Sequence, residues 1–264
     1  MRNDGKGGEA NGGRSRRQGI QAIARAGSVL RALEATPRGL GLGEIAAAVE
    51  LPKSTVHRLV AALAEEGLVD QEAGGRARLG VGLARLAAAG REALPDRLRP
   101  LLLELRRGLD ETVDLAVLDD DAVRFVEQVP APRRLRATSA VGIAFPLHCT
   151  ANGKALLAAL PEAEAAARLP ARLPRLTERT IVSRQALLVE LAQVRRDGVA
   201  FDREEHTDGI CAVGAAVLDP GGPVAAISVP VPAQRFEGNE ERLATQLRAA
   251  AKEATRLLGG TQVQ

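Results

Sequence analysis

The sequence has 264 residues, of which 45% are apolar, and its formal net charge is +3 at pH 7. This length suffices for two domains of ordinary size, each with its own core. The chain contains no run of about 18 apolar residues and no apolar signal core near its start, so we expect a cytoplasmic protein without membrane spans. Two cysteines without a CxxC motif indicate reduced thiols rather than a disulfide framework.

In residues 1–18, Arg14, Arg16 and Arg17 stand among Gly, Asn and Ser. Such a segment has little to bury, so we expect a disordered basic tail. It is either an arm that reaches along DNA or a solubilising leader without specific contacts. A second disordered tail is expected at residues 259–264.

Residues 42–69 predict two short helices joined by a tight turn. The first covers about Gly43–Glu50 and buries Ile45, and Leu51-Pro52 ends it, because a residue before proline is pushed out of the helical region. The second covers about Ser54–Glu66 and turns four apolar residues inward at helical spacing: Val56, Leu59, Val60 and Leu63.

Polar and basic side chains gather on the first turn and outer face of this second helix. They are Lys53, Ser54, Thr55, His57 and Arg58. In a helix-turn-helix, this part of the second helix enters the major groove and presents donors to phosphates and base edges. The alternative is an ordinary solvated face of a helical hairpin.

The flanking segments favour the DNA-binding interpretation. Upstream, a helix of about 15 residues is expected from its apolar spacing, with inward positions at Ile20, Ile23, Val29, Leu30 and Leu33. Downstream, residues 68–79 predict a hairpin with Ala73-Gly74-Gly75 at its tip. Arg76 and Arg78 share one face of its return strand, which suits a wing that contacts phosphate or the minor groove. Residues 19–80 therefore predict a winged helix-turn-helix domain. The chain has no Trp or Tyr, whose rings would stack on unpaired bases, and this favours duplex over single-stranded DNA as the partner.

Residues 81–96 predict a leucine-rich linker helix. We expect breaks at Leu94-Pro95 and Arg99-Pro100, with a second helix leading into a domain at 97–258. From Thr112 the apolar period becomes two, which predicts a strand containing Val113, Leu115 and Val117 and a hairpin partner from Val123. The acidic run Asp119–Asp121 between them is interpreted as a turn rather than a metal site.

The segment GIAFPLHCTANGKALLAAL, residues 142–160, predicts a strand that ends near Leu147 and a helix that begins near Thr150. Thr150 is a suitable N-cap. The free N–H groups expected at Ala151, Asn152 and Gly153 form a prepared site for a carboxylate or phosphate.

The winged helix, the leucine-rich linker and this PLHxTxxGKALLA-type segment together resemble the IclR family of bacterial transcriptional regulators. The stretch GVAFDREEHTDGICAVGAAVLDPGGPVAAISVPVP, residues 198–232, resembles the family's second signature. The resemblance covers residues 19–258. It implies an α+β protein with an N-terminal winged helix-turn-helix domain, a linker helix and a C-terminal GAF-like α/β effector-binding domain.

The resemblance also implies an effector site for small acidic metabolites. It assigns Ala151 and Asn152 at the helix start, then Asp202, Ala212, and Ser228 on the last strand. Two positions depart from the family pattern: Ala212 stands where a pocket cysteine is common, with Cys211 one place early, and Pro230 replaces a second serine. Both changes remove polar contacts, which suggests a larger, more apolar or aromatic acid.

Two other types of site are less consistent with the sequence. His148, Cys149, His206 and Cys211 have no standard zinc or nucleophile spacing, so we expect buried thiols and surface or pocket histidines without metal. The acidic run of Asp202, Glu204 and Glu205 beside His206 is interpreted as mostly solvated surface, and no GxSxG, P-loop or GxGxxG motif supports an enzyme.

The sequence thus predicts a cofactor-free DNA-binding regulator, with repression favoured, whose affinity for an inverted-repeat operator responds to a small organic or aromatic acid. We expect a homodimer or a homotetramer. The remaining alternatives are a ligand-independent regulator and a small-molecule enzyme with a DNA-binding head.

Overall fold

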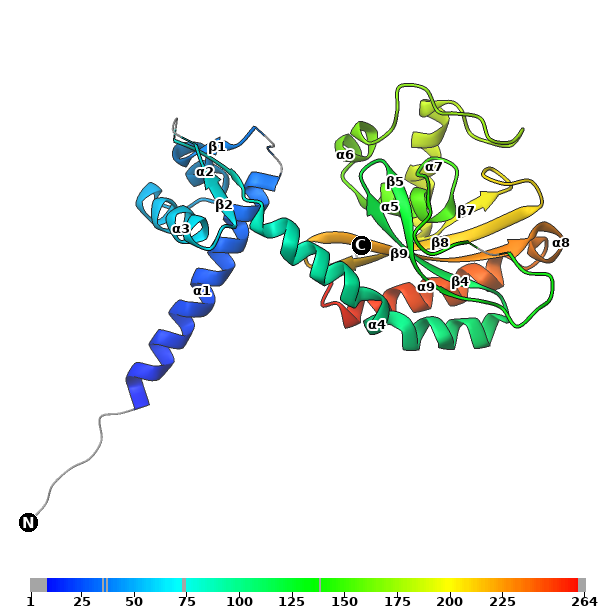
Figure 1. Ribbon diagram of the computed structural model, residues 1–264, viewed down its shortest axis with the longest axis horizontal. Coiled ribbons are helices and arrows are strands. Elements are labelled where there is room, and N and C mark those ends of the chain that lie inside the picture. The colour runs from blue at the N-terminus through cyan, green and yellow to red at the C-terminus, as the bar shows by residue number, and fades with distance from the viewer. Residues whose placement is uncertain (1–8, 35, 37, 73–74, 138, 261–264) are drawn as a thin grey trace, which may run out of the picture. The chain divides into compact units, whose positions relative to one another are not determined.

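The computed structural model describes residues 9–34, 36, 38–72, 75–137 and 139–260 (Figure 1). The chain divides into two compact units, Met1–Glu92 and Ala93–Gln264, so the boundary falls inside the predicted linker. The predicted α+β class, with a small-sheet helical unit followed by a larger sheet domain, is confirmed. Within the residues described, no helix is both long and apolar enough to span a membrane.

In its described residues, the first unit contains three complete helices, the start of a fourth, and a small antiparallel sheet. The complete helices are α1 (Glu9–Glu34), α2 (Leu42–Ala48) and α3 (Lys53–Glu65), and the strands are β1 (Leu40–Gly41), β2 (Val69–Gln71) and β3 (Arg76–Leu79). The sheet order is β1-β3-β2. The predicted hairpin is present as β2 and β3, although Ala73 and Gly74 at its tip lie outside the described residues. The short strand β1 had no signal in the sequence.

The core of this unit joins all three helices to the hairpin. Its buried members are Val29, Leu33, Ile45, Val56, Val60, Leu63, Val69 and Ala77. Among the side chains that the structure describes, which exclude Ile20, one predicted core position is wrong, because Ile23 is 75% exposed. Ile23 precedes Val29 by six residues, which places it about 120° away around the helix.

Helix α1 begins at Glu9, within the segment expected to be a disordered tail. Residues 1–8 lie outside the described part. Once the packed end of a helix is formed, each further residue adds a hydrogen bond without a new nucleation step, so the helix extends here despite Gly12, Gly13 and Gly19. At the other end of the chain, α9 ends at Leu257, and of the predicted tail 259–264 only the first two residues are described.

The predicted helix breaks at the prolines are wrong. A single helix, α4 (Gly82–Leu109), contains both Pro95 and Pro100. Each proline removes one backbone hydrogen bond. The helix continues because burial of its leucines outweighs that loss; five of them lie in the core of the second unit: Leu94, Leu98, Leu102, Leu105 and Leu109.

A six-stranded antiparallel sheet forms the centre of the second unit (Figure 1). Its strand order is β6-β5-β4-β9-β8-β7. The strands are β4 (Val113–Asp119), β5 (Ala122–Val129), β6 (Ala144–Pro146), β7 (Ala200–Arg203), β8 (Ile210–Asp219) and β9 (Gly222–Pro232). The predicted hairpin turn between β4 and β5 is confirmed, with Asp119 opposite Ala122.

Helices cover both faces of this sheet. They are α5 (Ala151–Ala159), α6 (Glu162–Ala167), α7 (Arg184–Asp197), α8 (Ala233–Phe236) and α9 (Glu240–Leu257). Side chains of α9 and of the second half of α4 pack on one face, and those of α5 and α7 on the other. The strands alternate between the two cores, as Leu115 and Val117 join the first while Ala116 joins the second.

Candidate functional site

The turn between α2 and α3 is built from backbone geometry. Glu50 has a left-handed φ of 53°, and the Leu51 N–H donates to the Ala46 carbonyl at 3.1 Å. Pro52 follows as the N-cap of α3, and its carbonyl accepts the N–H groups of Thr55 and Val56. The proline therefore starts α3, as the sequence predicted, whereas α2 already ends at Ala48, before Leu51-Pro52 is reached.

The donor cluster of α3 lies at the surface. Lys53, Ser54, His57 and Arg58 are exposed and Thr55 is half-buried, while Val56 turns inward. Within the described chain, Lys53 and Arg58 form no ion pair, so their charges are not neutralised by the protein. This arrangement suits a helix that meets a negatively charged groove.

The arginines of the hairpin are engaged internally. Arg76 donates to the Gly39 carbonyl at 2.6 Å and lies 3.5 Å from the Glu44 carboxylate. Arg78 lies 3.1 Å from Glu72 and 3.8 Å from Asp70. Both side chains share the predicted exposed face of β3. Exposed ion pairs of this kind are worth about 0–1 kcal/mol, so a DNA phosphate can compete for either arginine.

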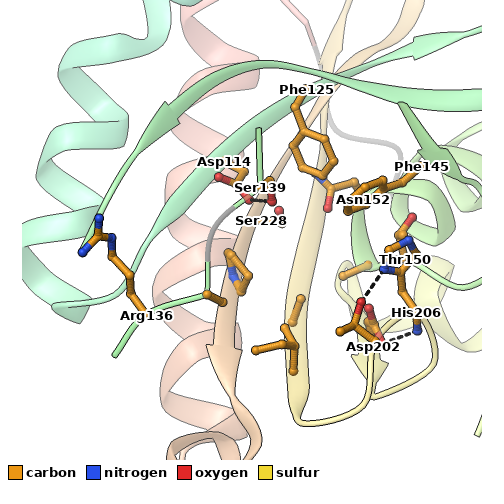
Figure 2. Close-up of a pocket in the computed structure, with 16 residues that line it drawn as sticks. Asp114, Phe125, Arg136, Ser139, Phe145, Thr150, Asn152, Asp202, His206 and Ser228 are labelled. Atoms are coloured by element: carbon orange, nitrogen blue, oxygen red, sulfur yellow. Dashed lines mark hydrogen bonds between the residues drawn. The ribbon is translucent and has the colours of Figure 1, made fainter. Parts of the chain in front are cut away.

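A cavity of about 300 Å³ lies in the second unit, between the start of α5 and the sheet (Figure 2). Sixteen residues line it, among them all five assigned from the family resemblance: Ala151, Asn152, Asp202, Ala212 and Ser228. Their placement follows from strand register, because Asp202 pairs with Ala212 and Ala212 with Pro230. A second row places Ser228 between Gly214 and Asp114.

Helix α5 reaches the cavity because two glycines let it approach its neighbours closely. A Cβ at Gly153 would lie 2.3 Å from the Leu147 carbonyl oxygen, and one at Gly214 would lie 2.6 Å from the Ala151 backbone. The helix begins after Thr150, whose hydroxyl accepts the Gly153 N–H at 3.2 Å, so the predicted cap is confirmed. The Gly153 N–H is consequently not free, contrary to expectation.

Unsatisfied donors remain at this helix start. The Asn152 side chain is 3% exposed and its Nδ2 has no hydrogen-bond partner. In the described part of the chain, no hydrogen bond is donated by the backbone N–H of Ala151 or Asn152 either. A buried donor without a partner is costly, and a helix N-terminus favours negative charge. The geometry fits a ligand group that accepts hydrogen bonds.

Asp202 shapes the loop after β7. Its Oδ1 accepts the backbone N–H groups of Glu205 at 2.7 Å and His206 at 3.4 Å. Burial raises the pKa of Asp202 to about 7, against the lowering effect of the Glu205 N–H bond. Its carboxyl group can therefore exchange a proton near neutral pH.

Aromatic side chains form part of the lining. The Phe145 ring stacks on His206 with centroids 4.1 Å apart, and Phe125 meets Phe145 edge to face at 5.0 Å. Burial lowers the pKa of His206, so its ring is mainly neutral at pH 7. None of these three was assigned from sequence as an effector-binding residue, although His206 was expected at the surface or in a pocket.

Asp114 is another lining residue that the sequence reasoning missed. It is 1% exposed, on β4. Its carboxylate accepts Gln128 Nε2 at 2.8 Å and Ser139 Oγ at 2.6 Å. Burial raises its pKa to about 6, while the bonds from Ser139 and Gln128 lower it. The signal available in the sequence was a carboxylate between two buried apolar residues of a strand.

The interpretation of the acidic run as solvated surface is wrong for Asp202 and Glu205, which are both buried. Glu205 accepts a hydrogen bond from Lys154 Nζ at 2.6 Å, and the same ammonium contacts Glu190 on α7. Lys154 is fully buried on α5. Burial raises the pKa of Glu205, whereas Lys154 lowers it. These residues form an ion-pair cluster beside the cavity, which no spacing rule indicated.

The His and Cys residues are dispersed. Cys149 and Cys211 are buried free thiols, and burial raises their pKa values to about 12 and about 11. His148 is neither at the surface nor in the cavity lining, since it is buried with Nε2 2.9 Å from the Pro174 carbonyl. Across the described residues, no three His, Cys, Asp or Glu side chains are grouped so as to hold a metal ion.

Comparisons with known proteins agree with this architecture. The family model "Bacterial transcriptional regulator IclR C-terminal" matches residues 87–256, and "IclR helix-turn-helix domain" matches residues 22–73. The HTH-type transcriptional regulator Rv1719 of Mycobacterium tuberculosis is 51% identical over 249 residues, which are 94% of this chain and 96% of that protein.

Solved structures share the whole fold. The crystal structure of the Thermotoga maritima IclR is similar with a TM-score of 0.61 and 27% identity, covering 92% of this chain and 99% of that one. An IclR homologue from Microbacterium hydrocarbonoxydans, complexed with 4-hydroxybenzoate, has a TM-score of 0.57 and 26% identity, covering 90% of this chain and 98% of that one. The chain therefore belongs to the IclR family of bacterial, DNA-binding transcriptional regulators.

Proposed function

We propose that the cavity at the start of α5 binds a small organic or aromatic acid, and that its occupancy changes the affinity of the protein for an operator. The observation that carries this proposal is the unpartnered Asn152 amide, buried beside the helix N-terminus in a cavity of about 300 Å³. Ala212 and Pro230 make one wall apolar. The homologue complexed with 4-hydroxybenzoate shows that a related protein accepts an aromatic acid.

On the DNA side, the proposed contacts are Lys53, Ser54, Thr55, His57 and Arg58 of α3, with Arg76 and Arg78 of the wing. One copy of the chain offers one such helix, so an inverted repeat calls for a homodimer or homotetramer with matching two-fold symmetry. We further propose that the protein acts as a repressor in the cytoplasm, where the DNA is. Coupling between effector and operator is expected to amount to about 1–3 kcal/mol.

The direct test measures binding of the purified protein to its own upstream intergenic DNA at several salt concentrations, with and without a panel of organic and aromatic acids. A change in specific binding caused by one acid supports the proposal. Specific binding that no acid alters would instead favour a ligand-independent regulator. Binding that is only salt-sensitive and non-specific would count against the assignment of α3.

Arg58→Ala tests the recognition helix. We expect a loss of about 1–3 kcal/mol in operator binding if Arg58 contacts a base, or a smaller salt dependence if it contacts phosphate. The matched control is Arg242→Ala, an exposed arginine on α9 of the second unit. Operator binding that is equal for both variants and the unmodified protein would remove Arg58 from the interface.

Asp202→Ala tests the cavity. We expect the acid response to disappear while DNA binding without ligand is retained, because Asp202 lines the cavity and orders its loop. Loss of ligand-free DNA binding would assign Asp202 a folding role instead.

A further inference from the structure

We propose that the carboxylate of Asp114 accepts a hydrogen bond from a hydroxyl group of the effector, so that the cavity prefers a hydroxyl-bearing aromatic molecule to its unsubstituted counterpart. This inference rests on the proposed effector site and adds the chemical class of its ligand.

The first support is the position of Asp114. It lies on the central strand β4, in register with Ser228 on β9, and both residues line the cavity. Figure 2 shows Asp114, Ser139 and Ser228 as one polar group, separate from the group of Thr150, Asp202 and His206. Besides Arg136, the cavity therefore has two groups of polar side chains (Figure 2), and the α5 N-terminus accounts for only one of them.

The second support is the chemistry of the Asp114 partners. Gln128 and Ser139 are both neutral donors, and in the described part of the chain Asp114 forms no ion pair. An ionised carboxylate offers about four acceptor positions, and these two bonds use two of them. A buried carboxylate without a cation gains from each further donor. A hydroxyl group supplies a donor, whereas a second carboxylate at this position would repel.

The third support is the rest of the lining, which fits one aromatic ring. Phe125, Phe145, Ile210 and Pro230 present apolar surface, and the volume is about 300 Å³. A dry cavity of about 150 Å³ suffices for benzene, so a substituted ring has room here. Asn152 Nδ2 remains as the donor for an acceptor group elsewhere on the ligand.

A purely structural role for Asp114 makes a different prediction. Through Ser139, the carboxylate also anchors the segment between β5 and β6. If it served only as this anchor, its removal would weaken every ligand by a similar factor. A recognition role weakens only ligands that carry the hydroxyl group, so a ligand pair that differs in that group separates the two roles.

The experiment is calorimetric titration of the full-length protein with benzoate, 3-hydroxybenzoate and 4-hydroxybenzoate, repeated with Asp114→Asn and Ser139→Ala. The amide introduced by Asp114→Asn would keep hydrogen-bonding capacity toward Gln128 and Ser139, so the fold is expected to persist, and a urea unfolding curve checks it. We expect one hydroxybenzoate to bind about 10- to 100-fold more tightly than benzoate, the range for a hydrogen bond to a charged group. Asp114→Asn should reduce this preference, because a charge-assisted hydrogen bond becomes a neutral one, and Ser139→Ala should retain it; the affinity of each variant for benzoate is the reference.

Each outcome decides between the proposals. Equal affinity for benzoate and both hydroxybenzoates, or a preference that Asp114→Asn leaves intact, overturns the role of Asp114. If the acids still bind and alter operator affinity in that case, the proposed effector site stands. If none of the three acids binds, both the aromatic-acid effector and the role of Asp114 are overturned.

Discussion

The two faces of the six-stranded sheet are built from the same strands but differ in side-chain size. Toward α4 and α9, the strands present branched aliphatic residues such as Leu115, Val213 and Ile227. Toward α5, the neighbouring positions are Asp114, Gly214 and Ser228. Both faces are covered, so burial alone does not distinguish them. Large side chains therefore stabilise one face, whereas small and polar side chains on the other face leave room for the start of α5 and for the cavity.

The largest expected effect tests whether the polar face also contributes to stability. Lys154→Met leaves Glu205 buried without its cation, and we expect a loss of about 3–5 kcal/mol in the free energy of unfolding. The double variant Lys154→Met/Glu205→Leu should recover most of it, because apolar replacement of both partners removes the unpaired charge. Urea denaturation measures both. A neutral single variant would show that the cluster is solvated in solution.

On the apolar face, Leu102→Ala should cost about 2–5 kcal/mol, because a fully buried leucine leaves a cavity between α4 and the sheet. The affinity of the folded protein for aromatic acids is expected to stay within about twofold of the unmodified value, since such distant sites usually act independently. Urea denaturation and calorimetric titration check the two parts. A large change in the affinity for aromatic acids would show that the two faces do not act independently.

A smaller effect is expected from Gly214→Ala, which adds a methyl group to the cavity face. Its Cβ would lie 2.6 Å from the Ala151 backbone, so α5 must shift at its start. We expect a loss of about 1–3 kcal/mol in stability and weaker effector binding. Gly90→Ala is the control, because a Cβ there meets nothing within 4 Å and lies on a helix. That control should be neutral or slightly stabilising.

The last test measures the pH dependence of stability, which depends on buried acids of the cavity face such as Asp202. Asp202 has a pKa of about 7 in the folded protein against 3.8 as a free side chain. The folded state holds the Asp202 proton more tightly than the unfolded state does. The resulting stabilisation of the folded protein is complete below about pH 4 and is lost as the pH rises through about 7.

Asp202→Asn should therefore reduce the fall in stability between about pH 5 and about pH 7 by up to about 1.4 kcal/mol per pH unit. Asp114 and Glu205 also lower the stability as the pH rises, whereas His148 and His206 raise it. The quantity to measure is therefore the difference in stability between the variant and the unmodified protein at each pH. Unfolding curves at several pH values provide it. Parallel curves would show that Asp202 is ionised throughout.

The sequence predicted the two domains, the helix-turn-helix and the cap at Thr150, because these depend on local spacing and turn chemistry. It failed where tertiary contacts outweighed local rules: leucine burial carried α4 through Pro95 and Pro100. The family resemblance named five residues that line the cavity, but Asp114 and Lys154 were missed. Both are charged residues whose burial depends on partners distant in sequence, such as Ser139 and Glu205, and no periodicity reveals those.

The unpartnered Asn152 amide has a consequence for how a ligand can be found without any DNA. A compound that binds the folded chain and not the unfolded one raises thermal stability, by about 2.7 kcal/mol at a free concentration 100-fold above its dissociation constant. Satisfying a buried donor adds to the affinity that drives this shift. The melting temperature of the isolated protein therefore reports occupancy of the cavity, and a library of metabolites can be ranked by heating alone.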